Sequence, residues 1–206
     1  GNDAGAVESN PAVLTVNAGP SFATYQDAVL ADKPIHYFRV EETTGPTATD
    51  LGTQAGAGGK FNGGFALDQT SFTEKLGKAL YLDGVDGSFV DLGLFHPGDA
   101  ITLEAWVNLA EDASRSTWHA IVARWDGSFE MDTNPSEMGN LVIRNDSNTF
   151  GIVDTPTPLT RGVWYHMVSV FADGTLSIYL NGLPGTVSTI GGVLQDAGPD
   201  QVLIGA

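Results

Sequence analysis

Residues 101–109 read Ile-Thr-Leu-Glu-Ala-Trp-Val-Asn-Leu, an unbroken alternation of apolar side chains with mostly polar ones. A period of two places successive side chains on opposite faces of a β-strand. The odd-numbered residues are therefore predicted to face a core between two sheets. Glu104, Trp106 and Asn108 are predicted to face outward, so that a large aromatic side chain lies among polar neighbours.

The same pattern returns later in the chain as a predicted hairpin. Val163–Phe171 is apolar on both faces, which is typical of a strand in the middle of a sheet. Asp173-Gly174 follows it, and Asp-Gly is a strong signal for a tight turn between antiparallel strands. Thr175–Asn181 then alternates again, with its even-numbered residues predicted to face inward.

The rest of the chain favours many short strands over helices. It has 206 residues, with 26 glycines and 10 prolines, and Asp-Gly or Asn-Gly pairs separate its apolar runs. Short strands between such turns indicate an antiparallel sandwich or jelly roll. One short helix is expected at Phe22–Leu30 with Ser21 as its cap, and Gly52–Gly64 is expected to be a surface loop. The further predicted strands are Ile35–Glu41, Ala79–Asp83, Ser88–Leu92, His119–Trp125, Asn140–Asn145, Thr149–Val153 and Gln201–Ile204.

Charge excludes some classes of partner. Nine basic and 25 acidic residues give a formal net charge of −16, and the basic residues do not cluster. Such a chain repels nucleic acid and anionic membranes but attracts divalent cations. No apolar run is long enough to cross a bilayer, so no membrane insertion is expected. The absence of cysteine excludes disulfides and thiolate metal sites.

The first twenty residues differ from the remainder of the chain. Ser9–Val16 is predicted to be one short strand, and Asn17–Pro20 ends it. The phrase Ser-Asn-Pro-Ala-Val-Leu-Thr-Val resembles the closing strand of bacterial immunoglobulin-like domains. Residues 1–20 are therefore interpreted as a remnant or linker of a preceding domain, and residues 21–206 as the main domain. The alternative is that Ser9–Val16 is the ordinary first strand of the main domain.

The main domain resembles the laminin-G-like domains of the concanavalin A-like lectin/glucanase superfamily. The phrases that carry the resemblance are Ile101–Val107, Gly162–Val168 and Leu176–Gly182. The resemblance implies an all-β, two-sheet antiparallel jelly-roll sandwich with one short helix near the N-terminus. Members usually continue into a final strand with an acidic pair, so the chain is expected either to be truncated after residue 206 or to complete its sheet with another segment.

Catalysis is not expected. Relatives that cleave sugar chains carry a Glu-x-Asp-x-x-Glu strand, whose carboxylates flank the scissile bond. Glu130-Met131-Asp132 is the nearest match, but the third position falls on Pro135, and the stretch is interpreted as a loop. His166 lies within a predicted strand and is interpreted as a packing residue.

Calcium is the expected ion, held structurally, because acidic glycine-rich loops supply the oxygen ligands it needs. The resemblance places it at Asp50, Asp83 and Asp86. A competing region is the acidic stretch from Asp126 to Glu137. The alternative to both is that these carboxylates are solvated surface groups.

A ligand surface is predicted around Trp106, because sugar rings offer apolar faces to aromatic side chains and hydroxyl groups to polar ones. Trp106 is alternatively a packing residue beneath a covering loop. The predicted ligand-binding residues are Trp106, Glu104, Asn108, Arg124, Arg144 and Tyr179.

Together these features predict a non-catalytic recognition or adhesion module of a secreted or cell-surface bacterial multi-domain protein. Its expected partners are carbohydrate or a surface protein ligand, together with neighbouring domains of a longer chain. The first alternative is a structural spacer in a surface stalk, and a glycoside hydrolase or polysaccharide lyase is less favoured.

Overall fold

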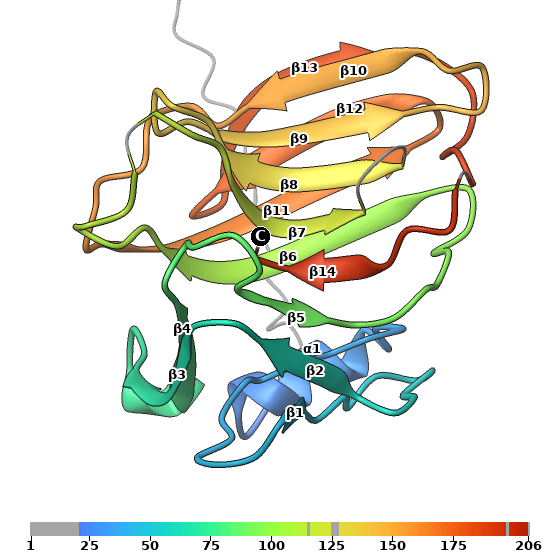
Figure 1. Ribbon diagram of the computed structural model, residues 1–206. Helices are drawn as coiled ribbons and strands as arrows, with labels where there is room; N and C mark the ends of the chain where they lie inside the picture. The colour runs from blue at the N-terminus through green and yellow to red at the C-terminus, as the bar shows by residue number, and fades with distance from the viewer. Residues whose placement is uncertain (1–20, 115, 125–127, 197, 206) are drawn as a thin grey trace, which may run out of the picture.

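The computed structural model describes residues 21–114, 116–124, 128–196 and 198–205 (Figure 1). The predicted strand Ser9–Val16 lies outside these residues. The regular secondary structure of the described chain is antiparallel β-structure with one α-helix and one 3₁₀ turn, which confirms the predicted fold class. The elements are α1 (Tyr25–Ala31), β1 (Thr47–Ala48), β2 (Gly59–Asn62), β3 (Phe65–Thr70), a 3₁₀ turn (Glu74–Leu76), β4 (Lys78–Leu82), β5 (Phe89–Asp91), β6 (Ile101–Asn108), β7 (His119–Arg124), β8 (Phe129–Thr133), β9 (Gly139–Arg144), β10 (Phe150–Asp154), β11 (Trp164–Ala172), β12 (Thr175–Leu180), β13 (Leu183–Thr189) and β14 (Val202–Ile204).

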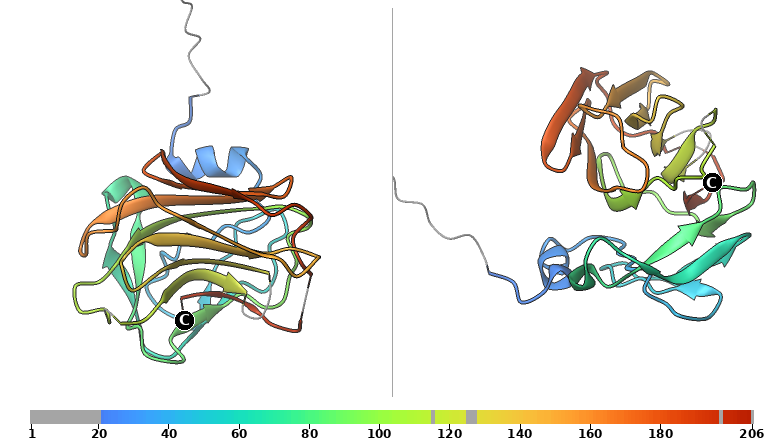
Figure 2. Two further views of the ribbon diagram at one scale, coloured as in Figure 1. Left: turned by 90° about the horizontal axis from the view of Figure 1, so that it is seen from above. Right: turned by 90° about the vertical axis from the view of Figure 1, so that its left-hand side faces the viewer.

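Two sheets form the sandwich. The larger has eight strands in the order β1-β2-β5-β14-β7-β8-β9-β10, and the smaller has four in the order β13-β12-β11-β6. A separate hairpin pairs β3 with β4. Figure 1 and the right-hand view of Figure 2 place α1 and the N-terminal strands at the opposite end of the molecule from β10 and β13.

The core lies between the two sheets. It is formed by the inward apolar side chains that the alternation in the sequence predicts. Met167 and Phe171 of β11 and Leu176 and Ile178 of β12 are fully buried, and they pack against residues of β8 and β9 in one cluster. The inward side chains of β6 pack on the same cluster. The predicted inward facing of the odd-numbered residues in 101–107 is therefore confirmed.

The predicted hairpin is also confirmed. β11 pairs with β12 from Met167↔Leu180 to Ala172↔Thr175, and β11 is flanked by β12 and β6. Asp173 and Gly174 both have positive φ angles, of 49° and 69°. Two positive φ values define the tight turn whose twist matches that of the flanking strands, and glycine adopts the second without strain.

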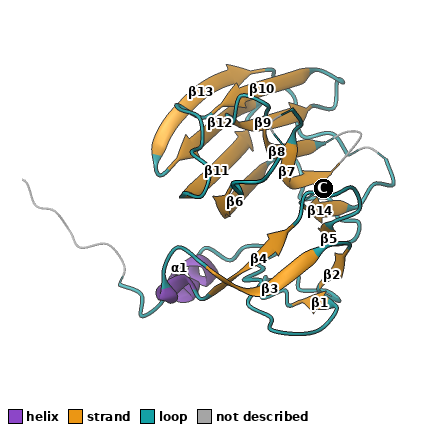
Figure 3. Cartoon of the chain, turned by 60° about the vertical axis from the view of Figure 1, so that its left-hand side comes forward, coloured by secondary structure: helices purple, strands orange, loops and turns teal. Residues whose placement is uncertain are grey.

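The helix begins later than predicted. α1 starts at Tyr25, and its cap is Thr24, not Ser21. The Thr24 side chain accepts a hydrogen bond from the Asp27 amide while the Asp27 side chain accepts one from the Thr24 amide, a reciprocal arrangement that stabilises a helix start. Figure 3 shows α1 beside the β3–β4 hairpin. No helix in the described part of the chain is long and apolar enough to cross a membrane.

Three other expectations were wrong. Ile35–Glu41 is not a strand: its one described bridge is Phe38↔Asp50, and Val40 has a φ of 52°. Gly52–Gly64 is not all loop, because β2 lies within it. Glu130–Asp132 is not a loop, because β8 pairs on both sides and Asn134-Pro135 comes only after it ends.

Leu176 and Leu183 offer a matched test of the core. Leu176 is fully buried, whereas Leu183 is 64 % exposed. We expect Leu176→Ala to lower the free energy of unfolding by about 2–5 kcal/mol, because a buried leucine leaves both lost apolar burial and a cavity. Leu183→Ala is expected to change it by less than about 0.5 kcal/mol. Urea unfolding of both variants measures the difference, and equal losses would contradict the described packing.

Candidate functional site

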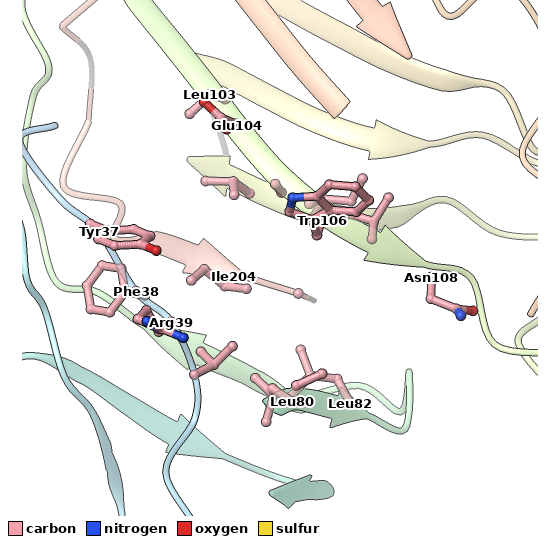
Figure 4. A pocket seen from close by; sticks show the side chains of 18 of the residues that line it. Tyr37, Phe38, Arg39, Leu80, Leu82, Leu103, Glu104, Trp106, Asn108 and Ile204 are labelled. Carbon is pink, nitrogen blue, oxygen red and sulfur yellow. The ribbon is translucent and has the colours of Figure 1, made fainter. Parts of the chain in front are cut away.

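A cleft of about 1130 Å³ runs along β6. Every residue of β6 lines it, including the inward Leu103 and the outward Glu104, so the cleft touches both faces of the strand. It follows the edge of β6 that no other described strand pairs with. Its other walls come from α1, residues 34–40, β4, β7 and β14. Figure 4 shows Ile204 of β14 between the side chains of β6 and those of Leu80 and Leu82.

Glu104 is the centre of a hydrogen-bonded group at the rim of this cleft. Its Oε1 accepts a hydrogen bond from the Tyr25 hydroxyl at 3.0 Å, and the Nε2 of His166 lies 2.9 Å from the same oxygen. The bond to His166 lowers the pKa of Glu104 despite partial burial. Burial raises the pKa of Tyr25 to about 12, and the nearby Glu104 carboxylate adds to the rise. At neutral pH the group therefore presents a carboxylate and a neutral phenol.

Trp106 contacts two other rings. Its indole stacks on Phe72 with ring centroids 5.0 Å apart, and the His166 ring lies 5.2 Å away on β11. Its Nε1 donates to the Tyr25 hydroxyl at 3.3 Å. Phe72, which comes from the turn between β3 and β4, keeps 56 % of its side chain exposed. Phe72 is thus the more exposed of the two stacked rings, and Trp106 supports it from one side.

Four of the six predicted ligand-binding residues share one sheet. Glu104, Trp106 and Asn108 alternate along β6 as predicted, and Asn108 lines the cleft. Tyr179 of β12 stands in the same cross-strand row as Glu104, because Val168 of β11 pairs with both. Two interstrand spacings, roughly 10 Å, separate Tyr179 from Glu104.

Arg124 and Arg144 belong to the eight-stranded sheet and do not join this group. Arg124 is buried, and its guanidinium donates to the carbonyl oxygens of Gly198 at 3.0 Å and Asp200 at 3.2 Å, which fixes the approach to β14. Arg144 lies over the Phe150 ring, 4.1 Å from its centroid. Both arginines therefore make structural contacts, and neither shares a site with Trp106.

Phe72 and Tyr25 were not identified from the sequence as site residues. They lie 34 and 81 positions from Trp106 along the chain, in an irregular turn and a short helix. No spacing rule connects such segments. The only sequence signal was for Phe72, which is an aromatic residue within a polar turn.

The three acidic residues predicted to hold calcium are not assembled. Asp50 accepts hydrogen bonds from the amides of Tyr37 and Gly52, both at 2.9 Å, and lies 2.7 Å from the His36 ring. Burial opposes its ionisation, but these hydrogen bonds outweigh burial and lower the pKa of Asp50. Asp83 accepts from the Val85 amide in its own turn. Across the described residues, no three His, Cys, Asp or Glu side chains are arranged to hold a metal ion, so calcium binding stays a prediction.

The competing acidic region contains a buried polar row. Asp126 lies outside the described residues. Asp132 of β8 faces Asn140 of β9, which pairs in turn with Asp154 of β10. Asp132 is only 3 % exposed, and its Oδ1 and the Oδ1 of Asn140 are buried without a described hydrogen-bond partner. Burial, with the charges of Glu130 and Asp154, raises the pKa of Asp132 to about 8.

Glu130 and Asp132 lie on one strand face, yet neither lines the cleft. A substrate held in the cleft therefore does not meet this carboxylate pair. The row instead places the neutral carboxyl group of Asp132 beside the side-chain oxygen of Asn140, which has no hydrogen-bond donor among the described residues.

This row predicts a pH-dependent stability. The unfolded chain releases the Asp132 proton near the ordinary pKa of 3.8, while the folded chain keeps it until about 8. The folded state therefore binds more protons between these values, and stability falls as pH rises from about 4 to about 8. We expect Asp132→Asn to melt at a higher temperature than the unchanged protein at pH 8 and at nearly the same temperature at pH 4.

Thermal melting from pH 4 to pH 9 measures this difference. Asp99→Asn, at an exposed aspartate, is the matched control and should follow the unchanged protein at every pH. A constant offset between Asp132→Asn and the unchanged protein would contradict the raised pKa.

Comparison with known proteins agrees with this architecture. Residues 82–206, more than half of the chain, match the laminin G family described as the concanavalin A-like lectin/glucanases superfamily. The chain belongs to this family. No curated protein sequence matches it.

Among solved structures, the fold is similar to that of two binding domains. The binding domain of Paraclostridial Mosquitocidal Protein 1 aligns with a TM-score of 0.59 and 12 % identity, over 85 % of this chain and 48 % of that one. The receptor binding domain of botulinum neurotoxin D aligns with a TM-score of 0.55 and 12 % identity, over 84 % and 48 %. The chain thus spans less than half the length of these structures, and the likeness concerns the fold.

Proposed function

We propose that this domain is a non-catalytic recognition module that binds carbohydrate at the rim of the β6 cleft. The observation that carries the proposal is the exposed ring of Phe72, stacked on Trp106 and next to the Glu104 carboxylate. An aromatic ring fixed from behind loses little conformational freedom when a sugar face stacks on it.

The polar group beside the ring has the chemistry that sugar hydroxyls need. Tyr25 and His166 both contact Oε1 of Glu104, so Oε2 is the oxygen available to accept a hydrogen bond from a ligand hydroxyl. The lowered pKa keeps Glu104 ionised at neutral pH, and hydrogen bonds to charged acceptors are stronger than those between neutral groups. A stacking surface beside an oriented carboxylate is an arrangement suited to recognition of a ligand that carries hydroxyl groups.

The comparisons support a binding module in general. The similar structures are named as binding domains, and the family description names lectins together with glucanases. A secreted or cell-surface bacterial setting, with carbohydrate or a surface protein as partner, belongs to the same proposal. The strong negative charge suits a partner that is not itself an anionic polymer.

A glycan array tests the proposal. We expect binding by the unchanged protein and at least a tenfold loss of affinity in Phe72→Ala, because the stacking ring is removed while the core is untouched. Phe150→Ala is the matched control, since Phe150 is 57 % exposed on β10 and far from the cleft. Equal binding by both variants would exclude Phe72 as the contact surface, and no binding by any protein on the array would favour the structural spacer.

Calcium is tested separately by calorimetric melting with added calcium and with chelator. An ion that binds only the folded state raises the melting temperature, because it stabilises that state by RT ln(1 + c/Kd), where c is the free concentration of the ion. We expect a higher melting temperature with calcium, and the array is repeated under both conditions. Identical melting curves would exclude a structural calcium ion.

A further inference from the structure

The cleft beside β6 offers backbone groups as well as side chains. β6 pairs with β11 over all eight of its residues, and no other described strand pairs with it. Among the described residues, no backbone hydrogen bond joins residues 101–108 to another segment on the edge away from β11. Every one of these residues lines the cleft. A strand edge of this kind carries a row of amide and carbonyl groups that a further extended segment can satisfy.

The cleft has the dimensions of one extended strand. Each residue of a strand rises by about 3.3 Å, so the eight residues of β6 span roughly 26 Å. A cleft of about 1130 Å³ along that length has a mean cross-section of roughly 43 Å². One strand fills roughly 48 Å², because neighbouring strands lie about 4.8 Å apart and packed sheets about 10 Å apart. With β4 and residues 34–40 on its other side, the cleft therefore admits a single strand.

The walls of the cleft are apolar on the side of the core. Leu103, Ala105 and Val107 face inward from β6 but are only partly buried, whereas the inward residues of β12 are buried. Leu80 and Ile204, which Figure 4 shows across the cleft from β6, are likewise partly buried. Apolar side chains of a docked strand would remove more of this surface from water, which is the main driving force for association.

Charge selects among the extended segments that would fit. Of the Asp, Glu, Lys and Arg side chains that line the cleft, four are acidic and two are basic. Both basic side chains are already paired with carboxylates: Arg39 Nε lies 2.6 Å from Glu41, and Lys78 Nζ lies 3.0 Å from Asp68. Glu104, on the outward face of β6, keeps 43 % of its side chain exposed. A strand beside β6 would place every second side chain in the row of Glu104, where opposite charge is favoured.

We infer that β6 accepts an extended, basic segment of a partner protein as an additional strand. The side chains of this segment alternate: apolar residues enter the core side beside Leu103 and Ala105, and Lys or Arg residues lie on the outer side in the row of Glu104. A second copy of this chain is disfavoured as the occupant, because each copy carries a charge of −16 and the cleft admits only one strand. The inference goes beyond the proposed function, which concerns sugar on the Phe72 ring at the rim.

A designed peptide tests the inference. The probe is the fluorescent, end-capped octapeptide Lys-Val-Thr-Val-Lys-Val-Thr-Val, titrated into the full chain by fluorescence anisotropy. The matched control has the same composition with its four valines consecutive. We expect the alternating peptide to bind about tenfold more tightly or better, because only its apolar side chains all lie on one face of a strand. Equal affinities, or no binding of the alternating peptide, would overturn the inference.

Methylation of the peptide backbone separates strand addition from side-chain contact alone. The amides of an extended peptide alternate between its two edges, so N-methyl groups on the valines block one edge and those on the other residues block the second edge. We expect at least one of these two methylated octapeptides to bind about tenfold more weakly than the unmodified one, because its hydrogen bonds to β6 are lost. Full affinity of both would overturn strand addition.

Hydrogen exchange locates the bound peptide. We expect the amides of β6 to exchange about tenfold more slowly when the octapeptide is present, with the amides of β12 unchanged as the internal control. Protection elsewhere without protection of β6 would overturn the inference. Amides of β6 that are already protected in a self-associated, peptide-free chain would overturn it in favour of a second copy as the occupant.

Glu104→Gln tests the basic character of the partner. We expect this substitution to weaken binding of the octapeptide by about two- to fivefold, and to leave unchanged the binding of a version in which threonine replaces both lysines. Equal effects on the two peptides would overturn the assignment of a basic partner. The titration contains no sugar and the glycan array contains no peptide, so failure of this inference and failure of the proposed function are distinguishable.

Discussion

The packing of one sheet against the other through β11 and β12 is the constraint on which the rest of the structure depends. Met167, Phe171, Leu176 and Ile178 are withdrawn completely from solvent, and apolar burial of this kind is the main favourable contribution to folding. Because side chains alternate along a strand, this inward set obliges the intervening residues to face outward. The group around Glu104 and Trp106 exists on the outer face for that reason.

The same constraint explains why the candidate site lies at β6. β11 is flanked on both sides and can offer only side chains, whereas β6 has a described partner on one side only and a cleft along its other edge. Around that edge, α1 contributes Tyr25 and the β3–β4 turn contributes Phe72, so a peripheral helix and a peripheral turn complete a site whose base is a core strand. The result is a rigid scaffold with recognition groups at its rim.

Charge is distributed differently in the two sheets. In the smaller sheet, Glu104 is held ionised by His166 and Tyr25 near solvent. In the larger sheet, Asp132 is enclosed beside Glu130 and Asp154, and its pKa is raised to about 8. A carboxylate with hydrogen-bond donors keeps its charge, and a buried one with acidic neighbours loses it. The first group can take part in recognition, whereas the second links the stability of the sheet to pH.

The strands of β6, β11 and β12, the tight turn at Asp173-Gly174 and the outward facing of Trp106 are determined by the sequence alone, since they depend on local periodicity and turn chemistry. The resemblance to the laminin-G-like family rests on the same segments. Only the tertiary structure decided that Phe72 covers Trp106, that Arg124 is buried away from it, and that Asp50, Asp83 and Asp86 do not form a cluster. Those outcomes depend on which segments, far apart in the sequence, come together in the folded sandwich. Local periodicity and turn chemistry do not specify these long-range contacts.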